Sequence, residues 1–152
     1  MRKDLIAEMR NEADSLLPPQ YLDCLRHVEQ PFFTPVYDFC SPRLAFGRVA
    51  LVGDAASTPR PHIGFGVSKA GAEAQVLTEA LSNYDDIDRA LSAYNAARQP
   101  LSERILAHSR KLGMQLGVGI ETDEDRRMAT LLQTPNGAMD WIAVPNFLDM
   151  RP

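Results

Sequence analysis

The sequence predicts an α/β fold, more narrowly an α+β fragment, from three observations. Several segments carry apolar residues at helical spacing, one short apolar segment is bounded by glycines, and another stretch is rich in aromatic and branched residues. The 152 residues are 45% hydrophobic and 24% charged, which is the composition of an ordinary globular domain and excludes a disordered or coiled-coil chain.

Two helices and a strand are expected in the first forty residues. Apolar side chains recur every three or four positions over residues 3–17, and two prolines end that helix. A second helix is expected over residues 19–29, with proline at its tolerated first position. Residues 32–39 favour a strand, which Pro35 restricts to an edge or a strand entrance.

The middle of the chain alternates strand, loop and helix. Residues 48–52 are apolar on both faces between flanking glycines, which predicts a central strand. Residues 55–66 contain two prolines and two glycines and should form a loop of fixed shape. Small and apolar residues over 67–83 then predict a helix that packs closely against a sheet or a ligand.

The remaining third is expected to be helical and then irregular. Residues 86–112 have nearly helical spacing, with Pro100 as a kink or a break between two helices. Thr122 and Asp125 resemble a capping box for a last short helix that ends near residue 133. The tail over 134–152 shows no regular element. These elements do not complete a sheet, so the chain is expected to be part of a larger protein or to pair with another chain.

Composition and charge exclude several classes of function. Sixteen Lys and Arg against twenty Asp and Glu give a net charge of −4, so a nucleic-acid partner is not expected. The two cysteines lack the spacing of a zinc site and are expected to be buried free thiols, and no metal is expected. No signal peptide or membrane-spanning run is found, which favours a cytoplasmic protein without a membrane partner.

Residues 47–74 carry the most chemical information. Asp54 follows the apolar strand and can accept hydrogen bonds from sugar hydroxyls, while a glycine-opened helix start presents free N–H groups and the positive end of its dipole. The segment therefore predicts a crevice for an anionic or electron-rich ligand. It lacks the dinucleotide-binding fingerprint, because Lys69 stands where the third glycine would be, and it has no Walker lysine.

The same segment resembles the second flavin-binding motif of the FAD-dependent aromatic hydroxylases, the single-component flavoprotein monooxygenases. The matching stretches are RVALVGDAA, RPH, GFG and the alanine-rich helix that begins VSKA. Their order and spacing match those of the motif without a gap. The RPH loop and the stretch over residues 31–38 resemble most the dihydroxypyridine hydroxylase branch. The resemblance extends over roughly residues 17–117.

The resemblance implies a set of FAD contacts. Asp54 would hydrogen-bond the ribityl or ribose hydroxyls after a turn at Gly53, and Pro61 would place its carbonyl against the flavin and the substrate. Backbone N–H groups at the following helix start would face the pyrimidine edge of the isoalloxazine and stabilise negative charge on the reduced ring. The expected cofactor-binding residues are Gly53, Asp54, Pro61, Gly64, Gly66, Val67 and Ser68.

Two side chains are candidates for a catalytic role, and each has an ordinary alternative. His62 lies in the motif loop, although a lone loop histidine is usually solvated or structurally bonded. Tyr37 is the choice from the aromatic stretch, although such stretches more often pack in a core. Lys69 is expected to be a solvated surface charge that could assist flavin electrostatics.

The resemblance also implies a domain organisation. Residues 1–40 would be a remnant of the substrate-binding region and a connecting strand, 41–117 the C-terminal part of the FAD-binding domain, and 118–152 a C-terminal helix and tail. The N-terminal Rossmann βαβ unit, which holds the FAD pyrophosphate in this family, has no counterpart in the sequence.

The implied function is that of an NADH- or NADPH-dependent monooxygenase that hydroxylates an aromatic or heteroaromatic, hydroxypyridine-like ring through a flavin C4a-hydroperoxide. The alternative is a non-catalytic truncated remnant or helical interaction module that does not bind FAD alone. The expected partners are a small aromatic substrate and either a complementing N-terminal chain or a second copy of this chain.

Overall fold

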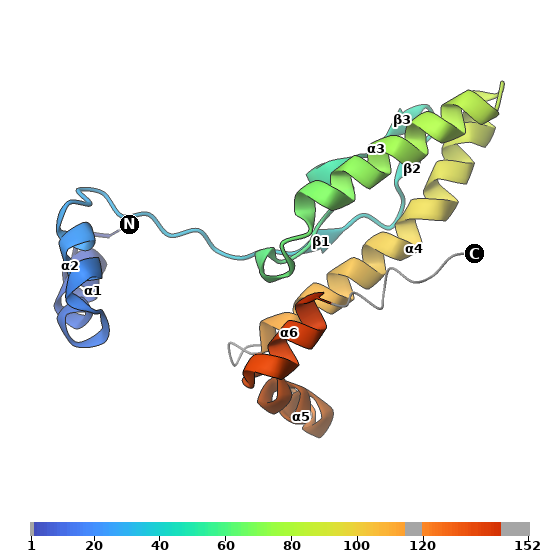
Figure 1. Ribbon diagram of the computed structural model, residues 1–152. Helices are drawn as coiled ribbons and strands as arrows, with labels where there is room; N and C mark the ends of the chain where they lie inside the picture. The colour runs from blue at the N-terminus through green and yellow to red at the C-terminus, as the bar shows by residue number, and fades with distance from the viewer. Residues whose placement is uncertain (1, 115–119, 144–152) are drawn as a thin grey trace. The chain divides into compact units, whose positions relative to one another are not determined.

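The computed structural model describes residues 2–114 and 120–143 and contains both helices and strands (Figure 1). The chain divides into two compact units, Met1–Pro35 and Val36–Pro152. Within the described ranges, no helix combines the length and the apolar character that crossing a membrane requires.

The first unit is a helix pair. Helix α1 (Lys3–Leu16) agrees with the prediction, and α2 (Pro19–Arg26) ends three residues earlier than predicted. Pro19 occupies the first helical position, where the missing N–H costs no intrahelical hydrogen bond. The guanidinium of Arg10 donates to the carbonyl of Val28 at 2.8 Å and ties the chain after α2 back to α1.

Two long helices, α3 (Gly66–Asn83) and α4 (Ile87–Gly113), run side by side through the second unit (Figure 1). Four two-residue strands accompany this α3–α4 body. Strand β1 (Phe39–Cys40) pairs antiparallel with β4 (Ser57–Thr58), and β2 (Ala45–Phe46) pairs antiparallel with β3 (Val49–Ala50). The core between helices and strands is formed by Leu44, Ala56, Ala80, Ala90 and Tyr94.

Tyr94 connects this core to the chain just after β3. Its ring is fully buried, and its hydroxyl donates to the carbonyl of Leu51 at 2.7 Å. Burial, together with the charge of Glu73, raises the pKa of Tyr94 to about 12, so the hydroxyl remains a donor over the whole physiological range. The backbone that leads into the next turn is thereby held against α4.

Two strand predictions are wrong in part. Only Val49–Ala50 of residues 48–52 is a strand, and it belongs to a hairpin with β2 instead of the centre of a sheet; Val49 is 60% exposed. Of residues 32–39, only Phe39 is in a strand. Aromatic and branched residues form strands where a neighbouring strand is available, and the described residues provide none beside 32–38.

Helix α3 starts one residue before its predicted position and ends at the predicted Asn83. Helix α4 continues through Pro100, so of the two predicted alternatives, a kink or a break between two helices, the break is wrong. Proline removes one hydrogen bond to the carbonyl four residues earlier, that of Ala96. Pro100 and Ala96 are both exposed, where water can satisfy that carbonyl without ending the helix.

The capping box is confirmed. The hydroxyl of Thr122 accepts from the Asp125 N–H at 3.1 Å, the Asp125 carboxylate accepts from the Thr122 N–H at 2.9 Å, and α5 (Asp123–Leu132) follows. The next helix, α6 (Pro135–Ala143), contradicts the prediction of an irregular tail over that range. Its start signal is Thr134, whose hydroxyl accepts from the Gly137 N–H, followed by a proline. Residues 144–152 of the predicted tail lie outside the described residues.

Candidate functional site

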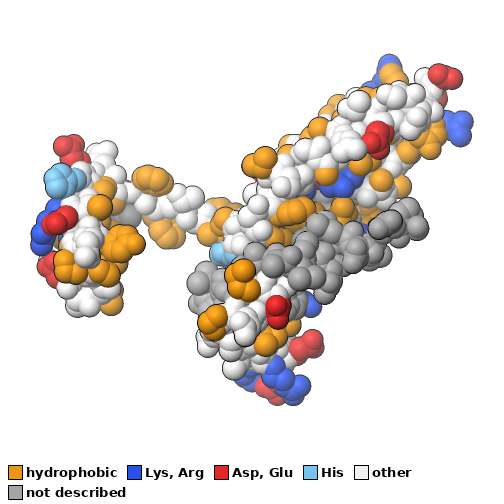
Figure 2. Space-filling view, in the orientation of Figure 1, with side chains coloured by type: hydrophobic (Ala, Val, Ile, Leu, Met, Phe, Trp, Pro, Cys, Tyr) orange, Lys and Arg blue, Asp and Glu red, His pale blue; other side chains and the backbone are white. Residues whose placement is uncertain are grey.

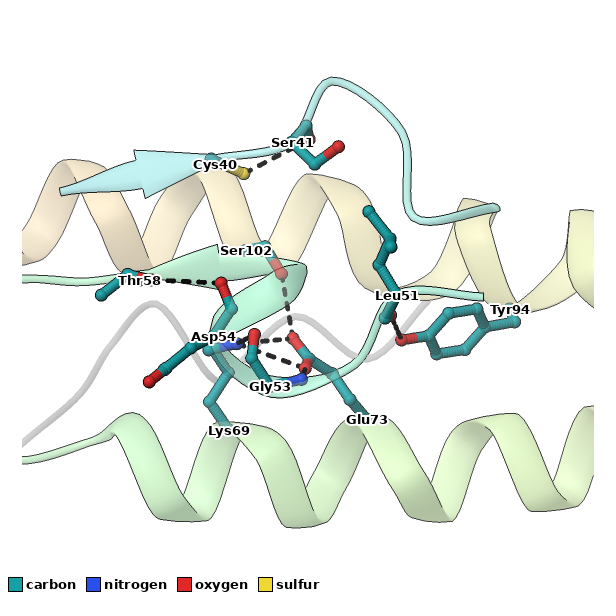
Figure 3. Close-up of polar contacts among 10 residues, drawn as sticks. All are labelled: Cys40, Ser41, Leu51, Gly53, Asp54, Thr58, Lys69, Glu73, Tyr94 and Ser102. Carbon is teal, nitrogen blue, oxygen red and sulfur yellow. Dashed lines mark hydrogen bonds and ion pairs between the residues drawn. The ribbon is translucent and has the colours of Figure 1, made fainter. Parts of the chain in front are cut away.

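A tight turn follows β3 and projects Asp54 into solvent. Gly53 has φ +67°, a left-handed conformation that favours glycine, and begins the 3₁₀ turn η1 (Gly53–Ala55). A Cβ added to Gly53 would lie 3.7 Å from the Cβ of Ala70, so the turn also packs closely on α3. The Asp54 side chain is exposed and points away from the buried groups beneath the turn (Figure 3).

Beneath the turn lies a buried ion pair that the sequence reading did not anticipate. Lys69 and Glu73, one helical turn apart on α3, are both fully buried, with Nζ 3.0 Å from Oε1. The Lys69 ammonium also donates to the Gly53 carbonyl at 2.9 Å, and Glu73 accepts from the Gly53 N–H at 2.8 Å (Figure 3). The expectation that Lys69 is a solvated surface charge is therefore wrong. The i,i+4 spacing of Lys69 and Glu73 in the sequence was the signal that could have indicated an ion pair between them.

The RPH loop is anchored by charges from elsewhere in the chain. Asp38, just before β1, accepts from Nε of Arg60 at 2.7 Å and from Nε of Arg110 on α4 at 3.0 Å. These hydrogen bonds hold the pKa of Asp38 below its usual value, and the bond from Arg110 has the larger effect. The Arg60 N–H also donates to the hydroxyl of Ser109 at 3.1 Å. The 3₁₀ turn η2 (Pro61–Ile63) is therefore fixed to α4.

The two catalytic candidates have different surroundings. His62 is half-buried against the end of α4, since a Cβ added to Gly113 would lie 3.2 Å from its Cδ2 and Nε2 atoms. Tyr37 is 77% exposed and makes no hydrogen bond with any residue in the described part of the chain. Pro61 is exposed on the same η2 turn as His62. Tyr37 is not among the residues that the structure draws together around the two turns.

The start of α3 is open to a ligand. Phe65 stands at the N-cap and has no side-chain oxygen, so the first amides of the helix are not capped by a side chain. Val67 is 88% exposed and Ser68 is also exposed. Gly64, with φ +62°, closes η2, and a Cβ added to Gly64 or to Gly66 would meet no atom of the described residues within 4 Å, its chain neighbours aside. Within the described part of the chain, this helix start therefore has no side-chain cap and has open space beside its two flanking glycines.

The site thus combines three elements on one scaffold: an exposed carboxylate on a rigid turn, an uncapped helix start and an anchored loop. The carboxylate can accept hydrogen bonds from hydroxyl groups, and the helix start can donate to an electron-rich edge. Asp38 and Arg60 were missed as parts of this arrangement, because an ion pair between distant segments leaves no local signal in a sequence. Glu73 was missed although its i,i+4 spacing from Lys69 is a local signal.

Comparison with known proteins makes this chain a homologue of FAD-dependent monooxygenases, which confirms the resemblance noted in its sequence. One relative is 2,6-dihydroxypyridine 3-monooxygenase of Paenarthrobacter nicotinovorans, 31% identical over 114 residues, which are 75% of this chain and 28% of the relative. Kynurenine 3-monooxygenase of Salinispora tropica is 33% identical over 138 residues, 86% of this chain and 30% of the relative.

The structural comparison agrees with the sequence comparison. The solved structure of 2,6-dihydroxypyridine-3-hydroxylase from Arthrobacter nicotinovorans matches with a TM-score of 0.66 and 28% identity, over 80% of this chain and 31% of that chain. The mixed fold thus matches part of a flavoprotein hydroxylase fold. The chain spans less than a third of the length of these relatives. No family model matches the sequence.

Proposed function

We propose that this chain forms part of the FAD site of a monooxygenase that hydroxylates an aromatic or heteroaromatic ring of hydroxypyridine type, with NADH or NADPH as reductant. The observation that carries the proposal is the exposed Asp54 carboxylate on the Gly53 turn, packed against the uncapped start of α3. The names of the relatives support the reaction class, since they include a 2,6-dihydroxypyridine monooxygenase and an FAD-dependent urate hydroxylase.

The residues present fit part of an FAD molecule. Asp54 would accept hydrogen bonds from ribityl or ribose hydroxyls. The N–H groups of Gly66, Val67 and Ser68 would donate to the electron-rich pyrimidine edge of the isoalloxazine, and the absence of side chains at Gly64 and Gly66 leaves room for that approach. When bound, FAD would supply the electron transfer and the activation of oxygen.

The residues of this chain would contribute a fixed arrangement of groups around the flavin and the electrostatic field of a helix start. The positive end of the 18-residue helix α3 stabilises negative charge at a group that lies over its first turn. Anchoring of the RPH loop by Asp38 keeps Pro61 and His62 at a fixed place on α4. Pro61 would place its carbonyl against flavin and substrate, and His62 and Tyr37 remain the candidates for contact with the substrate.

A second candidate function is an interaction module that does not bind FAD alone. Exposed hydrophobic side chains at the surface of the α3–α4 body favour it (Figure 2). Phe39, Phe46 and Val49 of the short strands are each between 44% and 60% exposed, and an apolar surface of this kind fits another protein surface. A complementing chain with the Rossmann unit, or a second copy of this chain, would cover it.

A chimera tests the first proposal against the second. This chain would replace the matched segment of the 2,6-dihydroxypyridine 3-monooxygenase of Paenarthrobacter nicotinovorans. If residues 36–114 form a working part of an FAD site, the purified chimera should retain bound flavin, seen as its absorbance band, and should oxidise NADH or NADPH when 2,6-dihydroxypyridine is added. A folded chimera that holds no flavin would favour the interaction module.

A further inference from the structure

Two buried charges call for an explanation beyond stability. Lys69 and Glu73 have no exposed surface. Removing both charges from water costs free energy, and the attraction between the two charges is often just enough to offset that cost. Hydrophobic residues of similar size at these two positions would commonly stabilise a fold as well. The role of the pair is therefore best sought in the groups that the two side chains contact.

Both side chains contact the backbone of one residue. Glu73 Oε2 accepts from the N–H of Gly53 at 2.8 Å, and Lys69 Nζ donates to the carbonyl of Gly53 at 2.9 Å (Figure 3). The N–H belongs to the peptide plane before Gly53 and the carbonyl to the plane after it. Fixing both planes fixes the two dihedral angles of Gly53, the residue for which the largest conformational range is open.

The direction of the next side chain depends on these two angles. Asp54 follows Gly53 directly, and its carboxylate has no hydrogen-bond partner among the described residues that could orient it. Ser102 on α4 donates to Glu73 Oε1 at 3.3 Å, so the pair is also tied to the second long helix. We call the two hydrogen bonds that join Lys69 and Glu73 to the Gly53 backbone the Gly53 clamp. Through Ser102, this clamp connects the turn to both α3 and α4.

We propose that Lys69 and Glu73 are positioning residues, which hold the Gly53 backbone so that the Asp54 carboxylate is presented to the ribityl or ribose hydroxyls of the flavin. The inference rests on the proposed function for its ligand, but its structural part concerns the free chain. A purely structural pair would raise the stability of the whole unit, whereas a positioning pair acts first on the Gly53 turn.

Amide hydrogen exchange of the full chain, followed by NMR, separates these two roles. The test variant is Lys69→Met/Glu73→Met, in which both charges are replaced by side chains of similar length. The matched control is Gln75→Met/Glu79→Met, because that pair has the same spacing on α3 and is joined by a 2.8 Å hydrogen bond, but is exposed. The reference amide is that of Leu106, in the buried face of α4.

The test variant is expected to raise the exchange rate of the Gly53 amide at least tenfold, with the Leu106 rate changed less than threefold. The residual dipolar coupling of the Asp54 Cα–Hα bond should change as well, since the turn is released. The control pair should leave the Gly53 and Leu106 rates and the Asp54 coupling as they are. An unchanged Gly53 rate, or equal acceleration at Gly53 and Leu106, would overturn the proposal.

The unmodified chain gives a second answer that does not depend on folding of a variant. A hydrogen bond from Gly53 to Glu73 should produce a measurable coupling between the Gly53 amide nitrogen and the Glu73 side-chain carboxyl carbon. Detection of that coupling supports the clamp, and its absence contradicts it. Neither experiment contains flavin, so failure of the clamp is distinguishable from failure of the FAD proposal, which the chimera tests.

Discussion

Arg60 of the RPH loop and Asp38, which precedes β1, form an ion pair with Nε and Oδ2 2.7 Å apart. Arg110 on α4 binds the other oxygen of the same carboxylate, so one aspartate joins three segments of the second unit. Because Asp38 is largely buried and its hydrogen bonds are charged, this junction contributes more than an exposed surface pair would.

Replacing this aspartate should have a pH-dependent cost. Asp38→Asn is expected to lower the free energy of unfolding by about 1 to 2 kcal/mol at pH 7, a charged hydrogen-bond contribution reduced because Arg110 is half exposed. In the folded chain the pKa of Asp38 is below its ordinary value of 3.8. The stability that the Asp38 charge contributes is therefore fully present above pH 3.8 and is lost as the pH falls through the folded-state pKa.

Urea unfolding of both proteins at pH 7 and pH 3, followed by circular dichroism, measures this difference. The parent's advantage should be smaller at pH 3. Asp85→Asn serves as the control, since Asp85 is exposed in the turn between α3 and α4. An advantage that stays constant over this pH range would show that the Asp38 charge is not the source of the stabilisation.

Gly66, the first residue of α3, is a position where a side chain should affect the flavin site more than the fold. Gly66→Val should change stability little, within about 0.5 kcal/mol, because a Cβ there approaches no atom that the structure describes outside its own helix backbone and chain neighbours. In the chimera the same change should weaken FAD binding more than tenfold, because the side chain would occupy the space over the helix start. Gly71→Val is the matched control on the same helix and also has open space around its Cα.

Thermal unfolding and a flavin fluorescence titration of the two valine variants check this prediction. The expected pattern is a selective loss of flavin affinity at Gly66. Equal losses of stability and of affinity, or equal effects of the two variants, would show that the space at Gly66 is not reserved for a ligand.

The two cysteines should differ in reactivity. Cys24 on α2 is exposed, against the expectation of a buried thiol, whereas Cys40 is half-buried. Burial, with a smaller effect from the charge of Glu103, raises the pKa of Cys40 above its ordinary 9.0, so its thiolate fraction at pH 8 is lower than that of a free thiol. Ellman's reagent should react with Cys40 at least tenfold more slowly than with Cys24.

The Cys24→Ser and Cys40→Ser variants assign the two rates. The slow rate should persist in Cys24→Ser and should increase as the pH is raised toward and beyond 9. Comparable rates for the two variants at pH 8 would mean that Cys40 is more accessible than its position in β1 indicates.

Local signals made part of this structure predictable from the sequence. The start of α3 and the Thr122–Asp125 capping box follow from residues within a few positions of one another, and both were located to within one residue. The strands were less predictable, because pairing of Val49 with Phe46 depends on which segments lie alongside. The motif residues of the candidate site stand in a continuous segment and could be named.

The supports of the site could not be named in the same way. Asp38 meets Arg110 across 72 positions, and nothing local marks either residue. Lys69 and Glu73 have the spacing of an exposed helical pair, yet both are buried and form hydrogen bonds with Gly53 and Ser102, which are distant in the sequence. Burial of a charge depends on tertiary contacts, which is why Lys69 was expected at the surface.

The chain by itself is predicted to bind FAD very weakly or not at all, because its sequence lacks the Gly-x-Gly-x-x-Gly fingerprint that holds a dinucleotide pyrophosphate. Immobilising a long flexible cofactor also costs at least ~4 kcal/mol. The exposed hydrophobic side chains of its short strands should also favour self-association. Gel filtration of residues 1–152 after incubation with FAD checks both points. A monomer that elutes with stoichiometric flavin would contradict them.

The central claim is that Asp54 binds the flavin, and the dissociation constant of FAD in the chimera with Asp54→Ala tests it most directly. Loss of a hydrogen bond to a charged group should weaken binding by about 1.5 to 3 kcal/mol, or roughly 10- to 150-fold, in a flavin fluorescence titration. Asp85→Ala, the same substitution at another exposed aspartate, should leave the constant unchanged. Equal affinities for FAD in the parent chimera and its Asp54→Ala variant would contradict the claim.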